Sequence, residues 1–362
     1  MIKTNYYQDL TKMNTFGMKV KARCFIEYDS VADLVDIEFE ELARPVLHIG
    51  GGSNLLFTDD FKGTVLHSKI NFIEILDECH SVPGMGKCPL HTNDTLSEGQ
   101  QKVLVSVGAG VVFDDFCAWA ADEGLWGAEN LSYIPGEVGA SAVQNIGAYG
   151  VEVKDIIYKV YCYDTVEEEF VSFDVDECEY GYRDSAFKDP ELKGRYIVTH
   201  VVFALSREPN PQLEYAHLKE AVGENVTVAQ IRKAIIKIRK EKLPEPSVMG
   251  SAGSFFKNPV ISTEHFRQIE SAAKAEFGAD YKVPHYDLPN GMVKVPAAWM
   301  IEQCGWKGKR SGGAAVYDKQ PLVIVNYTGE AFPEEIIGLE RRIIESVKKK
   351  FNVDLQPEVE HI

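Results

Sequence analysis

The chain has 362 residues, of which 45% are hydrophobic, and its 55 acidic residues outnumber 38 basic residues to give a formal net charge of −17. This composition is typical of a folded globular protein of two or three domains, and it excludes a disordered acidic chain. The acidic balance also argues against nucleic acid or an anionic membrane as the main partner, because such surfaces attract excess lysine and arginine. A small anionic ligand, which needs only a local basic pocket, remains compatible with it.

The seven cysteines are odd in number, widely spaced and without a CxxC pair. They are therefore predicted to be free thiols in a reducing compartment, with no disulfide or zinc framework. No uncharged apolar run reaches the roughly 18 residues of a membrane span, and the N-terminus lacks the apolar core of a secretory signal. We expect a cytoplasmic protein with no membrane segment and no metal.

Short runs rich in valine and isoleucine, bounded by glycine, predict strands through the first half of the chain. A helix is predicted from about Phe113 to Glu123, with Asp114 near its start and Gly124 as its stop. Strands outnumber helices here, so this half is expected to be α+β and not a βαβ array. The predicted strands are residues 45–49, 64–67, 103–107, 156–163 and 196–205.

Residues 77–102 interrupt this pattern, because the segment is polar, contains two prolines and has no hydrophobic period. It is predicted to be a surface hairpin insertion. Its cysteines and histidines, Cys79, His80, Cys88 and His91, have a spacing that fits no common zinc site.

The second half begins after a linker at residues 207–211. A helix follows, with Val228, Ile231, Ile235 and Ile238 on one face, and the prolines after Leu243 end it. We place a domain boundary in this region. Two more helices are predicted, one from Pro296 to Gly305 and one starting at Pro333, followed by a short terminal strand within 351–359.

Two glycine-rich segments are candidates for a phosphate-bearing ligand. Gly50-Gly51-Gly52-Ser53-Asn54 follows a strand, so its backbone N–H groups and two polar side chains could hold an anion, although the loop alone favours a structural turn. It is a poor Rossmann fingerprint, because the third glycine would fall at Leu55. The small, nearly uncharged residues 134–150 could lie against a flat ligand or simply pack tightly inside the protein.

Three further motifs carry polar chemistry. Arg183, in a GYRDSAFK segment, could clamp a carboxylate or form a surface salt bridge with Asp184. Ser254, in GSAGSFFKNP, does not fit the GxSxG nucleophile pattern, but it could donate a proton or cap a helix. Lys309 and Arg310, beside a hydroxyl and glycines, suit a diphosphate or an exposed basic turn.

The order of these motifs, from NTFG at residue 14 to PEV near the end, closely resembles the UDP-N-acetylenolpyruvoylglucosamine reductase (MurB) family, type I. The resemblance implies a two-lobed FAD-binding fold of the vanillyl-alcohol-oxidase (PCMH) type plus a separate α+β substrate-binding domain. It places one FAD lobe in residues 1–75, completed by a terminal strand in 353–362, and the other in 76–220. The substrate domain is expected in residues 221–352.

The resemblance also implies the chemistry. NADPH would reduce noncovalently bound FAD, and a hydride would then pass to the enolpyruvyl methylene carbon of the UDP-GlcNAc ether, giving UDP-N-acetylmuramate for peptidoglycan. Arg183 and Glu358 match the residues that stabilise and polarise the enolpyruvyl group, and Ser254 matches the proton donor. Lys257 or Arg183 could stabilise the serine alkoxide.

The remaining site residues follow from the same resemblance. Substrate-binding positions would be Tyr215, on a lid loop, with Lys242, Asn258, Tyr286 and Gln320. A monomer is expected. Cofactor-binding positions would be Gly50, Gly51, Gly52, Ser53, Asn54, Ile134, Pro135, Gly136, Gly139, Ala140, Ser141, Gln144, Asn145, Gly147, Ala148 and Gly150.

Two alternatives remain open. A flavin oxidase of the same fold superclass would often hold FAD covalently through histidine or cysteine, and His48 is the histidine next to the first glycine segment. A nucleotide-sugar binding protein without catalysis would bind UDP-sugar but no flavin.

Overall fold

The structure is a computed structural model that describes residues 1–76, 81–82, 86–87, 102–215, 218–223 and 226–362. Its elements fall into two compact units, each made of several stretches of chain. The first unit comprises Met1–Asp9, Lys21–Gly52 and Asp60–Arg239, and the second comprises Leu10–Val20, Ser53–Asp59 and Lys240–Ile362. These limits cut across the domain ranges expected from the sequence, since most of helix α5 belongs to the first unit.

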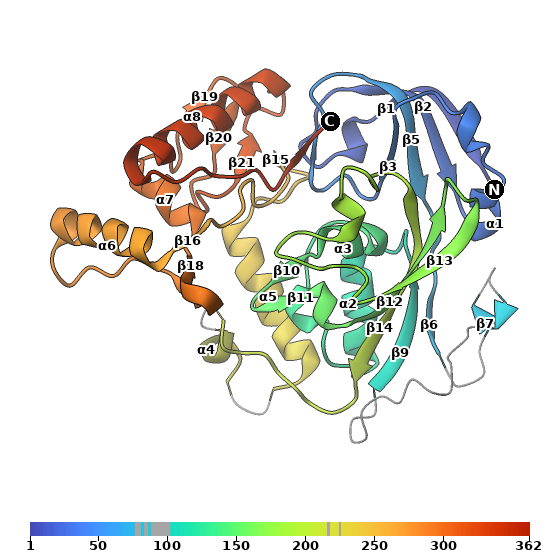
Figure 1. Ribbon diagram of the computed structural model, residues 1–362, viewed down its shortest axis with the longest axis horizontal. Coiled ribbons are helices and arrows are strands. Elements are labelled where there is room, and N and C mark those ends of the chain that lie inside the picture. Colours follow the sequence, from blue (N-terminus) through green and yellow to red (C-terminus); the bar gives the residue numbers. More distant parts are fainter. Residues whose placement is uncertain (77–80, 83–85, 88–101, 216–217, 224–225) are drawn as a thin grey trace. The chain divides into compact units, whose positions relative to one another are not determined.

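The first unit contains a small sheet built around parallel strands (Figure 1). Its strand order is β1-β2-β5-β3, and β5 pairs in parallel with both β2 and β3 while β1 is antiparallel to β2. One short helix, α1 (Val31–Val35), follows β2 and is capped by Ser30. The strands are β1 (Lys3–Asp9), β2 (Lys21–Tyr28), β3 (Val46–Ile49) and β5 (Phe61–Ser68).

A larger antiparallel sheet, in the order β13-β12-β14-β9-β6, forms the rest of this unit with its helices. The sheet strands are β6 (Ile73–Ile75), β9 (Lys102–Gly108), β12 (Ile157–Asp164), β13 (Glu169–Asp174) and β14 (Tyr196–Ser206). The helices are α2 (Phe113–Asp122), α3 (Val138–Gln144), α4 (Leu218–Val222) and α5 (Val228–Lys242). Two strand pairs lie outside the sheets, β7 (Ser81–Val82) with β8 (Gly86–Lys87) and β10 (Gly147–Ala148) with β11 (Val151–Glu152).

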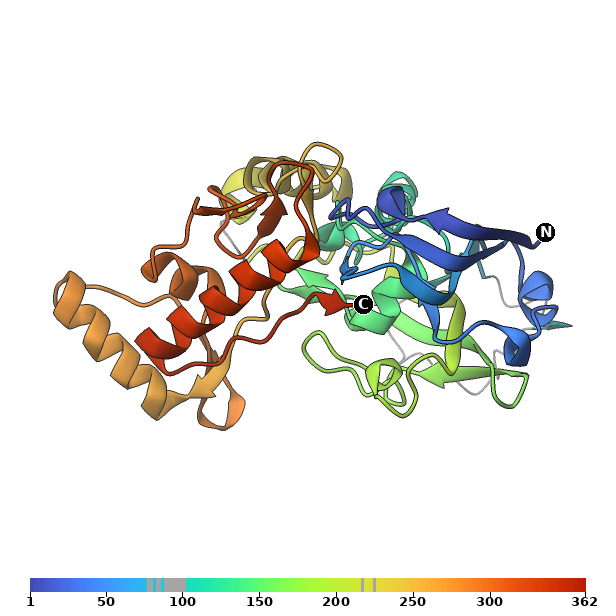
Figure 2. The ribbon, with the colours of Figure 1, turned by 90° about the horizontal axis from the view of Figure 1, so that it is seen from above.

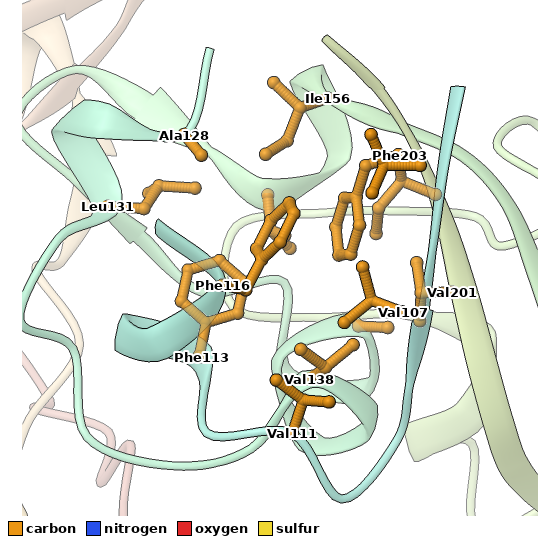
Figure 3. Packing of buried hydrophobic residues seen from close by; sticks show 14 of the residues in the cluster. Val107, Val111, Phe113, Phe116, Ala128, Leu131, Val138, Ile156, Val201 and Phe203 are labelled. Atoms are coloured by element: carbon orange, nitrogen blue, oxygen red, sulfur yellow. The ribbon is translucent and has the colours of Figure 1, made fainter. Parts of the chain in front are cut away.

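Helices α2 and α3 share one hydrophobic core with β9, β12 and β14, and Figure 3 shows its centre. The rings of Phe116 and Phe203 stack with their centroids 4.5 Å apart, and Phe113 meets both edge-on. All three rings are buried. This packing orients α2 and α3, and with them the small-residue segment that contains α3.

The second unit has three sheets of short strands. The first has the order β15-β21-β20-β19, the second the order β16-β18-β17, and the third joins β4 in parallel to β22 at the end of the chain. The strands are β4 (Leu55–Leu56), β15 (Gly250–Ser251), β16 (Val260–Ser262), β17 (Tyr286–Leu288), β18 (Met292–Lys294), β19 (Arg310–Ser311), β20 (Ala314–Val316), β21 (Ile324–Asn326) and β22 (Glu360–His361).

Three helices complete the second unit: α6 (Thr263–Phe277), α7 (Ala297–Gln303) and α8 (Pro333–Phe351). Helix α8 buries the apolar face predicted from its spacing, at Ile336, Leu339, Ile343 and Val347. After α8 the chain turns and runs back beside the helix to its end, as Figure 2 shows. Single turns of 3-10 helix occur in both units at Thr11–Met13, Phe39–Glu41, Glu129–Leu131, Val153–Asp155, Ala186–Lys188 and Pro289–Gly291.

Two differences from the sequence expectations stand out. The strand predicted at 351–359 is wrong, because Phe351 still belongs to α8 and the strand is Glu360–His361, which lies within the expected 353–362 and pairs with β4. Helix α6 was missed, since its apolar residues Phe266, Ile269 and Ala273 are sparse among polar ones.

The other predicted elements agree with the structure to within a few residues. The five described cysteines, Cys24, Cys117, Cys162, Cys178 and Cys304, are free thiols as predicted. The predicted hairpin at 77–102 falls largely outside the described residues, and so do Cys79, His80, Cys88 and His91. No helix of the described ranges is long and apolar enough to cross a membrane.

Replacing Phe116 tests the aromatic core. Phe116→Ala removes a fully buried ring that stacks on Phe203, so it should lower the free energy of unfolding by about 3–5 kcal/mol. The exposed Val166, on the same unit, supplies the control, and Val166→Ala should change stability by less than about 0.5 kcal/mol. Urea unfolding of both variants measures the difference, and equal effects would contradict this description of the core.

Candidate functional site

The two glycine-rich segments lie against each other inside the first unit. A Cβ atom at Gly51 would be 3.4 Å from Cα of Gly136, and one at Gly50 would be 3.1 Å from Cβ of Ala140. At Gly50, therefore, a side chain would need its neighbours to shift slightly. Segments almost ninety residues apart in sequence thus pack closely against each other.

The first segment needs its glycines for its shape as well. Gly52 has φ +59°, a left-handed conformation that glycine adopts without strain. The chain then continues through Ser53 and Asn54 into β4. Backbone-rich, uncharged turns of this kind suit the phosphates and flat ring system of a large dinucleotide.

The second segment is a loop followed by a short helix, not a loop throughout. Helix α3 covers Val138–Gln144, and a Cβ at Gly139 would be 2.9 Å from Cβ of Ala109. The Ser141 hydroxyl donates to the Val138 carbonyl, and the Asn145 amide donates to the Gly181 carbonyl at 2.7 Å. The small residues of α3 therefore allow tight packing inside the protein. Gly139, Ser141 and Asn145, which the sequence predicts as cofactor contacts, pack against or donate hydrogen bonds to neighbouring parts of the chain.

Two charged residues hold the beginning of that loop. The Asp114 carboxylate accepts from the backbone N–H of Tyr133 and from the Arg232 guanidinium, while Arg239 donates to the Tyr133 carbonyl. Burial alone would raise the pKa of Asp114, but these hydrogen bonds outweigh it and hold the pKa below its usual value. Tyr133 has φ +61° and directly precedes the predicted Ile134 and Pro135. Sequence reasoning gave Asp114 only a place near the helix start and missed both arginines.

Arg183 is bound to the second glycine segment. Its guanidinium donates to the carbonyls of Asn145 and Gly147, at 3.3 and 2.6 Å, and lies 3.9 Å from Glu152. Arg183 itself has φ +56°. The same turn is joined to α3 by Ser185, which donates to the Val143 carbonyl, and by Lys188, which donates to Gln144 Oε1. The structure thus brings Arg183 to the predicted cofactor loop.

The segment after Ser254 pairs with the segment that contains Glu358, inside the second unit. Phe256 forms an antiparallel bridge with Pro357, the Glu358 N–H donates to the Phe255 carbonyl at 2.8 Å, and the Lys257 N–H donates to the Gln356 carbonyl at 2.9 Å. Residues 255–257 and 356–358 are therefore neighbouring segments. The pairing places the backbone of Glu358 opposite Phe255, the residue that follows Ser254.

Asn54 connects this pair to the first glycine segment. Its side-chain amide donates to the Glu358 carbonyl at 2.9 Å, and its own carbonyl accepts from the Glu360 N–H at 2.9 Å. The Thr58 N–H and hydroxyl both reach the Ile362 carbonyl. The N–H of Glu358 is thus bound by Phe255, and its carbonyl is bound by Asn54. The sequence predicted Asn54 as a cofactor contact and gave no signal of this role.

The NTFG motif at residues 14–17 forms hydrogen bonds with the strands next to Ser254. The Thr15 carbonyl accepts from the Ser251 N–H, and the Phe16 carbonyl accepts from the Asn326 side chain. A Cβ at Gly250 would lie 2.2 Å from the Phe16 carbonyl oxygen, so only glycine fits there. Gly253 has φ +70°, which lets the chain bend just before Ser254.

The predicted substrate residues are spread over both units. Tyr215 is 38% exposed and packs edge-on against Tyr149 at 6.2 Å in the first unit. In the second unit, Lys242 is an exposed residue at the end of α5, and the Asn258 side chain accepts from the Ala297 N–H at the start of α7. Tyr286 is exposed on β17 near Lys294, and Gln320 forms a turn with Val323. Among the described residues no cluster of acidic, histidine or cysteine side chains could hold a metal ion.

Two family models match the chain. One, described as the C-terminal domain of UDP-N-acetylenolpyruvoylglucosamine reductase, covers residues 245–362, and the other, described as an FAD binding domain, covers residues 22–166. The first range contains Ser254 and Glu358, and the second contains both glycine-rich segments. These matches, with the mixture of helices and strands in both units, confirm the predicted fold class.

Similar proteins match over almost their whole length. The chain is 48% identical to UDP-N-acetylenolpyruvoylglucosamine reductase of Bacteroides fragilis strain YCH46, over 98% of each chain. It is 42% identical to the enzyme of the same name from Porphyromonas gingivalis strain ATCC 33277, over 98% of this chain and 97% of the relative. A crystal structure of UDP-N-acetylenolpyruvylglucosamine reductase from Thermus caldophilus superposes with a TM-score of 0.64, covering 100% of this chain and 98% of that one at 22% identity, and it supports the fold.

The ion pair between Asp114 and Arg232 predicts that the protein's stability falls in acid. Because its pKa is lowered in the folded state, Asp114 contributes stability at neutral pH that is lost as the pH falls through that lowered value. Asp114→Asn should reduce the free energy of unfolding at pH 7 by about 1–3 kcal/mol and weaken its decline in acid. Urea unfolding across the acid range measures both, and an unchanged pH dependence would contradict the assignment.

The bond from Asn54 predicts the behaviour of the terminal segment. Asn54→Ala removes the donor to the Glu358 carbonyl, so the amides of residues 358–362 should exchange hydrogen about tenfold faster. Thr58→Val, which removes one of two donors to the Ile362 carbonyl, is the matched control and should have a smaller effect confined to the last residues. Hydrogen exchange read by NMR checks this, and unchanged protection in Asn54→Ala would show that the amide does not hold the segment.

Proposed function

Because the chain belongs to the UDP-N-acetylenolpyruvoylglucosamine reductase family, we propose that it reduces UDP-N-acetylglucosamine enolpyruvate to UDP-N-acetylmuramate, a precursor of peptidoglycan. It is an oxidoreductase that uses FAD as its cofactor and NADPH as its reductant. The observation that supports the residue assignment is the backbone pairing in the second unit that joins the segment following Ser254 to the segment containing Glu358.

The first unit fits FAD on structural grounds. The segments at Gly50–Gly51 and Gly136–Ala140 pack so closely that little room is left for side chains between them, and both fall within the matched FAD binding domain. The proposed FAD contacts are those named from the sequence in residues 50–54 and 134–150, with Gly139, Ser141 and Asn145 supporting them through packing and hydrogen bonds. Once reduced by NADPH, bound flavin would supply the hydride for the enolpyruvyl double bond.

Arg183 would bind the carboxylate of the enolpyruvyl group. Hydride addition at the methylene carbon places negative charge on the adjacent carbon and its carboxylate, and a fixed cation stabilises that charge. The guanidinium is already oriented by the carbonyls of Asn145 and Gly147, so little reorganisation is needed when charge develops. Glu358 would polarise the same group.

Ser254 would donate the proton that completes the reaction. Its Oγ carries the proton that passes to the carbon beside the carboxylate. A serine hydroxyl is a weak acid, so its alkoxide needs a nearby cation, and Lys257 on the same segment or Arg183 would supply it. The left-handed Gly253 before it and the buried Phe255 after it fix the course of the backbone at Ser254.

The remaining proposed contacts concern binding. Lys242 would contact phosphates of NADPH and substrate, Asn258, Tyr286 and Gln320 would contact the diphosphate and uridine, and Tyr215 would close over the sugar. We further propose that the protein is a cytoplasmic monomer. Both properties agree with its substrate, which is a small soluble molecule.

Flavin content tests the proposal. Purified protein should be yellow after FAD addition and desalting, and acid precipitation should release the flavin into the supernatant. Flavin that stays with the pellet would instead favour a covalent flavin oxidase, with His48 as the first candidate for attachment. A protein without flavin absorbance, even after FAD addition, would contradict the proposal.

Substituting the proton donor separates the two half-reactions. Ser254→Ala should leave reduction of the flavin by NADPH within about twofold of the parent, and slow oxidation by the enolpyruvyl substrate by about 10²–10⁴-fold. Ser247 is an exposed serine in the chain segment that leads to Ser254. Ser247→Ala should leave both rates unchanged. Anaerobic stopped-flow absorbance measures each step, and equal slowing of both in Ser254→Ala would refute the proton-donor role.

A further inference from the structure

A buried histidine that the proposed chemistry does not use lies between two glutamates in the first unit. His67 is on β5, the strand between β2 and β3, and is 2% exposed. Its Nε2 is 3.0 Å from Glu137 Oε1, and its Nδ1 is 3.2 Å from Glu27 Oε1. Glu27 is the direct register partner of His67 on β2, whereas Glu137 belongs to the second glycine-rich segment.

Both nitrogens of the ring therefore face carboxylate oxygens. An ionised carboxylate only accepts hydrogen bonds, and a neutral imidazole has one N–H donor. For both contacts to be hydrogen bonds, His67, Glu27 and Glu137 must therefore hold two protons between them. Both protons can be on the histidine ring, as imidazolium, or one can be on the ring and one on a carboxyl group. With fewer protons, two acceptors would face each other in a buried place, which is costly.

A neutral histidine and one cation lie next to this place. His48 on β3 lies 2.7 Å from the Tyr28 hydroxyl, and burial, with His67 as a second cause, lowers the pKa of His48 to about 4. His48 is thus neutral at pH 7 and can accept from Tyr28, whose pKa burial raises. The cation is the half-exposed Lys69, whose Nζ is 3.9 Å from Glu27 Oε1, the oxygen that also faces His67. That distance is too long for a hydrogen bond, so the contact between His67 and Glu27 still needs a proton of its own.

Glu137 links the histidine to the glycine surface. A Cβ at Gly50 would lie 3.3 Å from Glu137 Oε2 and 3.1 Å from Cβ of Ala140, so the carboxylate is packed directly behind the first glycine segment. Glu137 precedes α3 as its N-cap residue and bridges to Val112 through its backbone. His67 thus holds the carboxylate that packs against Gly50, in addition to the backbone contacts of Glu137.

We propose that Glu27, His67 and Glu137 form a buried triad that shares two protons and fixes the spacing of the two glycine-rich segments, so that His67 is a positioning residue for the FAD-binding surface. This inference rests on the proposed function for the identity of the ligand. The triad itself belongs to the protein without any ligand, so its protons can be observed separately.

Titration of apoprotein with FAD tests the proposal. His67→Gln can keep at most one of the two contacts, and it should weaken FAD binding at least tenfold. His200→Gln is the matched control, because His200 is also a buried histidine of the first unit but has the hydroxyl of Thr199, not a carboxylate, beside its ring, and it should bind FAD as the parent does. Equal FAD affinity in parent and His67→Gln would overturn the proposal.

Proton NMR of the parent provides a second readout that needs neither FAD nor a folded His67 variant. Two exchange-protected protons should appear far downfield, and the nearly isosteric Glu137→Gln should shift or remove one of them. One or no such proton in the parent would overturn the triad. A parent that shows both protons but binds no FAD would leave the triad in place and refute the proposed function instead.

Discussion

The structure depends most on one backbone pairing, between residues 255–257 and the terminal segment 356–358. Each N–H to carbonyl bond there is formed by main-chain atoms, so it tolerates changes of side chain. The pairing holds Glu358 opposite Phe255, the residue that follows Ser254. Asn54 adds a side-chain bond to the Glu358 carbonyl, and β4 pairs with β22 just beyond it. A glutamate close to the end of the chain is thereby fixed as firmly as one within a sheet.

In the first unit, close packing and side-chain hydrogen bonds fix the two glycine-rich segments proposed to bind the cofactor. Two glycine-rich segments approach so closely that a Cβ at Gly50 would disturb them, and charged groups fix the surrounding backbone. Asp114 and Arg239 hold Tyr133, Arg183 binds the carbonyls of Asn145 and Gly147, and His67 binds Glu137. The two segments contain a single charged residue, Glu137, and ion pairs and hydrogen bonds around them set their geometry. This arrangement explains how a chain of net charge −17 can offer a site to an anionic dinucleotide.

Sequence reasoning predicted the elements with strong local signals. Helix α8 and the core strands follow from the spacing of their apolar residues, and the family followed from the order of motifs. The helix within the small-residue segment was hidden, because its glycine, alanine and serine residues carry no apolar period. Long-range partners such as Asn54 with Glu358, or His67 with Glu137, leave no local pattern at all. Their roles are created by the fold, and only coordinates reveal them.

Transfer of electrons from NADPH through bound FAD to an enolpyruvyl UDP-sugar can be observed directly. The parent protein is mixed anaerobically with NADPH and then with UDP-GlcNAc-enolpyruvate, while flavin absorbance is recorded. The oxidised-flavin absorbance should be lost in the first step and return fully in the second, with one equivalent of UDP-N-acetylmuramate formed. Flavin that stays reduced after the enolpyruvyl ether is added would contradict the proposed reaction.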